Sequence, residues 1–232
     1  MRQVIVLYGI VLRRPSLFAR SEYVQILGVR FYICYVGREP FSRGAAARRL
    51  RRRGVYDCIF QESFRIGKAF ARRGIAPVAT EPLVREMAAV LCLAERERRG
   101  LCGPVAIHAA SGDEVKRTVE ELLPRVRHIS LGTMRGRERL CADFLYEKGA
   151  VLSFAEREEL AEAETLLLFA PPGGFTPENA LTVRLYGDAE PRFALSEELE
   201  KQLPPELPRL GLMAALYRAG AIQKGDIFPL CD

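Results

Sequence analysis

The sequence predicts an α/β protein whose second half is a doubly wound, mostly parallel sheet, preceded by a smaller α/β region. Two observations predict this class. Apolar runs that do not alternate with polar residues begin near residues 104, 127, 150 and 165, and a stretch with helical spacing joins each run to the next. Such strands are buried on both faces, as in a parallel sheet covered by helices on both sides. Right-handed crossovers then give the doubly wound arrangement.

Each element of the second half follows from its local pattern. Apolar side chains recur at three- and four-residue intervals in the helical stretches, and Gly149 is suited to end the second of them. Strands are therefore expected at 104–110, 127–132, 150–154 and 165–171, and helices at 112–123, 137–149 and 155–163. A proline-rich loop at 202–211 leads into a last helix at 212–220.

The first half is less regular. Apolar segments at 2–12 and 23–37 are expected to be strands, and an antiparallel pair is one arrangement open to them. Residues 80–100 have the spacing of one long helix, with Thr80 as its N-cap and Gly100 at its end. The intervening elements are expected to be a basic helix at 42–54, a strand at 55–60 and a helix at 63–74.

The composition is that of an ordinary globular protein, with 49% hydrophobic residues and a mean hydropathy of −0.01. The apolar run at 4–12 is too short to span a bilayer and is interpreted as a buried strand rather than a signal peptide. Six cysteines are scattered without a CxxC pattern and only two histidines are present, so no metal site is predicted. This cysteine usage favours a reducing, cytoplasmic compartment.

The charge is unevenly distributed along the chain. Residues 1–100 carry 20 basic and 8 acidic side chains, whereas residues 101–232 carry 15 basic and 21 acidic ones. This asymmetry predicts a basic α/β region at 1–79, a connecting helix at 80–100, and a second domain with C-terminal helices at 101–232. The arginines of the first half suit phosphate groups, although a codon bias towards arginine or a solvated helix face would produce the same pattern.

The strand–turn–helix at 104–123 lies where a dinucleotide-binding protein has the sequence G-x-G-x-x-G. Only Gly112 matches that pattern. Asp113 and Glu114 follow it in the first helical turn, where an acid repels a phosphate. The run from Ser111 to Glu114 instead fits an S-x-x-E capping box, and capping is favoured here over pyrophosphate binding.

The second strand is followed by Thr133, Arg135, Arg137 and Arg139. Arginines at this place accommodate the 2′-phosphate of NADP, whereas an exposed helix start would explain them equally well. The stretch ISLGTMRGRERL (129–140) resembles the N-R-T-x-x-R motif of shikimate dehydrogenases and glutamyl-tRNA reductases, with Thr133 matching. The run AEAETLLLFAPPGGF resembles the ADLVVNATPLGM run of the same family, which implies a Rossmann-like NAD(P)-binding domain over residues 100–175.

The loop PPGGFTPEN (171–179) follows the fourth strand at the carboxyl edge of the sheet, where open α/β sheets bind ligands. Gly173 and Gly174 would let a ligand approach the backbone, although a plain strand-exit turn would use the same residues. No catalytic residue is assigned. The family implied by the resemblance uses a lysine and an aspartate of its first domain, but Lys68 lies in a basic helix and Asp57 in mid-strand. His108 is interpreted as a core or rim residue.

Several functions remain open from the sequence. The first is a nucleotide (NADP-like) or small-anion binder, with or without redox activity, that uses Gly112, Thr133, Arg135, Arg137, Gly173 and Gly174. The second is a nucleic-acid-binding or regulatory module that uses Arg48, Arg49, Arg51, Arg52 and Arg53. The third is a non-enzymatic interaction protein that forms a homo-oligomer through its opposed charges. No membrane partner is expected.

Overall fold

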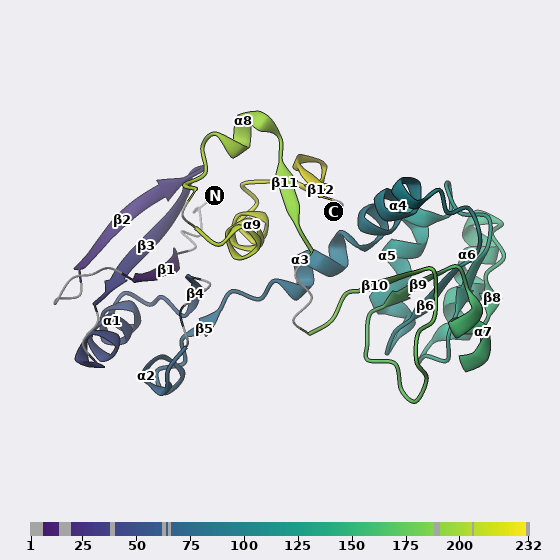
Figure 1. Ribbon diagram of the computed structural model, residues 1–232, viewed down its shortest axis with the longest axis horizontal. Helices are drawn as coiled ribbons and strands as arrows, with labels where there is room; N and C mark the ends of the chain where they lie inside the picture. Colours follow the sequence, from purple (N-terminus) through teal and green to yellow (C-terminus); the bar gives the residue numbers. More distant parts are fainter. Residues whose placement is uncertain are drawn as a thin grey trace. The chain divides into compact units, whose positions relative to one another are not determined.

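The computed structural model of the chain describes residues 7–13, 20–37, 40–61, 64, 66–187, 191–205 and 207–230. Two expected elements are only partly described. Positions 2–6 of the expected strand at 2–12 lie outside the described residues, and so do positions 63 and 65 of the expected helix at 63–74. The chain divides into two compact units, which are residues 1–80 with 193–228 and residues 81–192 with 229–232 (Figure 1). This division differs from the sequence-based one, because 81–100 joins the second unit and 193–228 joins the first.

The first unit contains a five-stranded sheet in the order β2-β3-β1-β4-β5. Only β2 is antiparallel to its neighbour. The expected single strand at 23–37 is instead a hairpin, because Leu27 and Gly28 adopt positive φ angles of 47° and 79° and reverse the chain. An antiparallel pairing of the first two apolar segments is therefore wrong, since β1 pairs with β3 in parallel. The strands are β1 (Leu7–Arg13), β2 (Arg20–Ile26), β3 (Val29–Val36), β4 (Asp57–Phe60) and β5 (Ala76–Pro77).

Helices cover both faces of this sheet. The helices α1 (Pro40–Arg52) and α2 (Lys68–Ala71) share a core with one face, in which Leu50 and Phe70 pack with Cys34 and Cys58. On the other face, a Cβ atom placed on Gly211 would lie 3.4 Å from the Ile59 side chain, so α9 packs closely on β4. The remaining elements of the unit are α8 (Glu197–Glu200), α9 (Arg209–Arg218), a 3-10 turn (Lys224–Asp226), and the paired strands β11 (Phe193–Leu195) and β12 (Ile227–Pro229).

The second unit is the doubly wound α/β domain that the sequence predicts. Its five strands are all parallel and follow the order β10-β9-β6-β7-β8 (Figure 1). The strand β10, which continues the sheet beyond β9, is not expected from the sequence. The strands are β6 (Val105–His108), β7 (Ile129–Leu131), β8 (Ser153–Phe154), β9 (Thr165–Leu168) and β10 (Leu181–Arg184).

The helices of the second unit lie on both faces of its sheet. On one side, α5 packs against α4 and α6. On the other side, Leu160 of α7 packs with Ala106, Leu166 and Leu168 of the strands. The long helix expected at 80–100 is divided at Met87, whose φ and ψ of −88° and 3° are not helical. The helices are α3 (Glu81–Glu86), α4 (Ala88–Arg99), α5 (Gly112–Leu122), α6 (Arg137–Lys148) and α7 (Arg157–Glu162).

A buried arginine ties α4 to the sheet. The side chain of Arg96 is 6% exposed, and its Nη1 donates to Thr165 Oγ1 at 2.6 Å while its Nη2 donates to the Gly103 carbonyl at 2.8 Å. The Glu164 carboxylate lies 3.5 Å from the same guanidinium and accepts the Gly103 N–H at 2.6 Å. This cluster, together with packing against α5, β9 and β10, attaches α4 to the second unit. Within the described part of the chain, no helix is long and apolar enough to cross a membrane.

Candidate ligand-binding pocket

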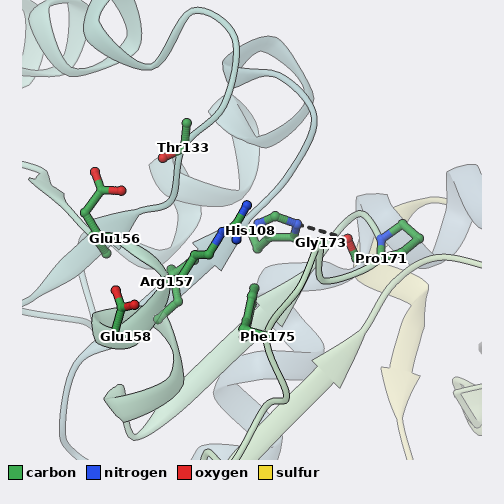
Figure 2. Close-up of a pocket in the computed structure, with 10 residues that line it drawn as sticks. His108, Thr133, Glu156, Arg157, Glu158, Pro171, Gly173 and Phe175 are labelled. Atoms are coloured by element: carbon green, nitrogen blue, oxygen red, sulfur yellow. Dashed lines mark hydrogen bonds between the residues drawn. The ribbon is translucent and has the colours of Figure 1, made fainter.

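A pocket of about 610 Å³ opens at the carboxyl edge of the second sheet. The strands β6 and β9 are neighbours there, and the chain continues from them towards opposite edges of the sheet. Open α/β sheets bind their ligands at such a switch point. The residues around this pocket follow the ends of four strands that are adjacent in the sheet, β9, β6, β7 and β8 (Figure 2). They are His108, Thr133, Ala155, Glu156, Arg157, Glu158, Leu160, Pro171, Gly173 and Phe175.

His108 ends β6 and forms one wall of the pocket. Its Nε2 lies 3.1 Å from the carbonyl oxygen of Pro171, and because a carbonyl can only accept, Nε2 carries the proton. Its Nδ1 is buried and has no hydrogen-bond partner in the described part of the chain. The ring of Phe175 meets the imidazole edge-on, with the centroids 5.7 Å apart. The wall therefore combines aromatic surface with a ring nitrogen that is buried without a hydrogen bond.

The first turn of α7 forms the opposite wall. Glu156 and Glu159 form a reciprocal capping box, in which the Glu156 N–H donates to the Glu159 carboxylate at 2.8 Å. Figure 2 shows the side chain of Arg157 extending towards His108. A Cβ atom on Gly174 would lie 3.3 Å from Arg157 Nη1, so the 171–175 loop lies close to this guanidinium. The pocket thus contains the guanidinium of Arg157 together with the carboxylates of Glu156 and Glu158.

A second cation lies beside this wall. The guanidinium of Arg137 stacks over the Phe154 ring, 4.2 Å from its centroid, and the side chain is only 14% exposed. Its Nε and Nη1 are buried and make no hydrogen bond within the described residues, because the nearest carboxylates, Glu138 and Glu156, are 3.7 and 3.9 Å away. The positive charge of Arg137 therefore lies next to Glu156 of the pocket rim without a hydrogen bond to it.

The turn before α5 is occupied by the protein itself. The Gly112 N–H donates to the carbonyl of Arg135 at 2.8 Å, and the Arg135 N–H donates to the carbonyl of Ala110 at 3.2 Å. A Cβ atom on Gly112 would lie 3.0 Å from the Gly136 carbonyl oxygen, so this glycine serves close packing of one turn on the other. The place of a pyrophosphate in a dinucleotide site is therefore filled by the 134–136 segment.

The capping box expected at Ser111 and Glu114 is wrong. Ser111 makes no capping hydrogen bond with its side chain. The Glu114 carboxylate accepts the Ala110 N–H at 3.3 Å and pairs with the guanidinium of Arg85, which also donates to the Phe169 carbonyl at 3.0 Å. A carboxylate of the chain therefore lies at the positive end of α5, and an arginine of α3 neutralises it.

The structure brings together some of the residues proposed from the sequence. Thr133 and Gly173 line the pocket, and Gly174 lies against Arg157. Arg137 is not part of the lining, but its guanidinium lies 3.9 Å from the carboxylate of Glu156, which is. The side chain of Arg135 is exposed outside the pocket lining, and Gly112 is buried in the filled turn. Sequence reasoning did not propose Arg157, Glu156, Glu158 or Phe175. The signal for the first three was their position in the first helical turn after a parallel strand, at the ligand-binding edge.

No protein-family model and no curated protein matches the sequence. Matches among solved structures include L-tryptophan dehydrogenase from Nostoc punctiforme, at 10% identity and a TM-score of 0.32, covering 69% of this chain and 55% of that one. The chain thus spans about half the length of that enzyme. A shikimate dehydrogenase in complex with NADP+ matches at 12% identity and a TM-score of 0.31, over 80% of this chain and 70% of that one. Likeness at this level assigns neither a ligand nor an activity to this chain.

Proposed function

We propose that the pocket at the carboxyl edge of the second unit binds a small anionic ligand of the nucleotide class, with NADP(H) as the first ligand to test. The observation that carries the proposal is the pocket of about 610 Å³ at the switch point, which contains Arg157 and borders Arg137. Its size suits a nucleotide-like molecule, and its aromatic wall with a few converging polar groups is typical of ligand sites.

The groups in the pocket suit different parts of a nucleotide. His108 and Phe175 offer aromatic edges and faces to a planar base. The Arg157 guanidinium in the pocket, and the Arg137 charge beside its rim, are suited to a phosphate. The carboxylates of Glu156 and Glu158 can accept hydrogen bonds from ribose hydroxyls. Gly173 adds backbone that a ligand can approach closely.

The filled turn before α5 restricts how a dinucleotide would bind. The Gly112 N–H, which would otherwise face a pyrophosphate, already donates to the Arg135 carbonyl. Binding therefore depends on the arginine side chains and is strongest for the phosphorylated adenosine half of NADP(H). We accordingly expect 2′,5′-ADP to compete with NADPH, and NADH, which lacks the 2′-phosphate, to bind more weakly.

Titration with NADPH, followed by the emission of the nucleotide, tests the proposal. Excitation in the nicotinamide absorption band does not excite the protein, whose fluorescent residues are eight tyrosines and no tryptophan. Replacing Arg157 or Arg137 with alanine should raise the Kd by about tenfold or more, because each removes a charged hydrogen-bond donor. The matched control is Arg139→Ala on the exposed side of α6, which should leave the Kd unchanged. Absence of binding by NADPH and 2′,5′-ADP at millimolar concentration rejects the proposal.

A further inference from the structure

The first unit carries a strongly basic helix, α1, whose last two turns and the residue after them hold five arginines. The side chains of Arg48, Arg51, Arg52 and Arg53 are exposed and form no ion pair with any described residue. Ala46, Ala47 and Leu50 of α1 face the sheet. At about 100° per residue, Arg48 and Arg52 therefore point directly away from it, while Arg49 and Arg51 lie on its flanks. One side of α1 is thus a row of exposed guanidinium groups.

The described acids of this unit form no ion pair with Arg48, Arg51, Arg52 or Arg53. Between residues 7 and 80, the described carboxylates are those of Glu22 and Asp57. Glu22 accepts the Tyr35 hydroxyl at 2.6 Å, and Asp57 pairs with Arg218 at 3.1 Å. The other described acids of this unit are in the 193–228 segment, and Figure 1 shows its acidic helix α8 apart from α1 and α2.

The neighbouring helix widens the basic surface. α2 packs beside α1, and Arg43 Nη1 lies 3.6 Å from the place of a Cβ atom on Gly67 (Figure 1). Lys68 of α2 and Arg72, the residue that follows α2, are both exposed. We call the whole area the α1–α2 basic surface, which comprises Arg48, Arg49, Arg51, Arg52, Arg53, Lys68 and Arg72.

An exposed aromatic ring lies beside each end of α1. At its C-terminal end, Tyr23 is 41% exposed, and the guanidinium carbons of Arg30 and Arg53 lie 4.5 and 5.7 Å from its ring centroid. Tyr32 supports it from the adjacent strand, with the ring centroids 4.8 Å apart. At the N-terminal end, Phe41 is 82% exposed. The helix has 13 residues, so its two ends are about 20 Å apart.

We infer that the α1–α2 basic surface binds single-stranded nucleic acid. Cationic side chains between exposed aromatic rings are what a flexible polyanion with stacking bases requires, since the cations follow the phosphates and the rings stack on bases of any sequence. An anionic lipid surface fits less well. A helix that lies in a membrane buries an apolar face in it, and the apolar face of α1 already packs on the sheet.

Fluorescence anisotropy of the whole chain with labelled oligo(dT) and oligo(U) of about 16 nucleotides tests the inference. If about four phosphates are neutralised, log K falls against log salt with a slope of about −3, so affinity drops about 50-fold between roughly 50 and 200 mM salt. The two oligonucleotides show whether the 2′-hydroxyl matters. The pocket in the second unit is not involved, so this binding survives Arg157→Ala.

Two variants separate the phosphate and base contributions. The double substitution Arg48→Gln with Arg52→Gln should reduce the salt slope to about half, because two of about four phosphate contacts are lost. The matched control, Arg127→Gln with Arg139→Gln, removes the same charge from exposed sites of the second unit and should leave the slope unchanged. Tyr23→Leu should weaken binding about 5- to 150-fold at every salt concentration without changing the slope.

Three results would overturn the inference. One is the absence of oligonucleotide binding at low salt, and another is an identical salt slope for the Arg48/Arg52 variant and its control. The third is full binding by Tyr23→Leu together with equally tight binding to vesicles of phosphatidylcholine and phosphatidylserine, which would reveal a general anionic-surface binder. Far-UV circular dichroism of each variant at the assay temperature shows that the fold is retained.

Discussion

Replacing Gly9 with alanine should destabilise the first unit strongly. Gly9 lies in β1, opposite Tyr32 and Cys58 of the flanking strands. A Cβ atom at this position would lie 2.9 Å from both Leu50 Cδ2 and Val55 Cγ1, and it would also overlap Cys58 Sγ. All three neighbours are fully buried, so none can move into solvent.

The expected cost follows from overpacking. A methyl group forced into a filled core costs about 1–3 kcal/mol, and three rigid neighbours place this site at the upper end. The loss of glycine flexibility in the unfolded chain offsets about 0.5–1 kcal/mol of that cost. The net loss of about 2–2.5 kcal/mol should lower the Tm of a unit this size by about 8–10 °C.

A matched glycine provides the control. Gly44 lies within α1, and a Cβ atom there would meet nothing within 4 Å. Gly44→Ala should therefore raise stability by about 1 kcal/mol through helix propensity alone. Six of the eight tyrosines belong to the first unit, so thermal unfolding followed by tyrosine fluorescence reports mainly on that unit. A Gly9→Ala protein within about 0.5 kcal/mol of the parent would refute the close packing of β1 on α1 and β4.

Three further predictions concern the buried Arg96, the buried thiols of Cys34 and Cys92, and the partly buried Glu114. Arg96→Met removes two buried hydrogen bonds and should cost about 2–4 kcal/mol in urea unfolding, whereas Arg98→Met, on the exposed side of the same helix, should cost less than about 0.5 kcal/mol. Burial raises the pKa values of Cys34 and Cys92 to about 12, so above pH 9 only the unfolded thiols ionise. Stability should then fall with rising pH between about 9 and 12, by about 1.4 kcal/mol per pH unit for each thiol, and the slope should shrink on replacing either cysteine with alanine. Glu114→Gln should cost about 1–2 kcal/mol at low salt by removing the anion from the positive end of α5, and a stability unchanged from the parent would contradict that role.

The candidate pocket shows what a local pattern misses. Thr133 and Gly173 follow strands at the ligand-binding edge, and their places in the pocket can be anticipated from that position alone. Arg157 belongs to a different strand–helix connection, and only the packing of α7 across the sheet brings it towards His108 (Figure 2). The pairing of Glu114 with Arg85 joins residues 29 positions apart, and neither residue signals the other in the sequence.

The sequence by itself determined the parallel α/β character of the second unit and most of its strands and helices, because apolar periodicity records which faces of a local segment are buried. It also determined the concentration of positive charge in the first half. The tertiary structure decided three further features. They are the antiparallel pairing of β2 with β3, the addition of β10 as the fifth strand of the parallel sheet, and the return of residues 193–228 to the first unit. It also filled the turn before α5 with the 134–136 backbone, since strand neighbours and close backbone contacts depend on which distant segments pack together.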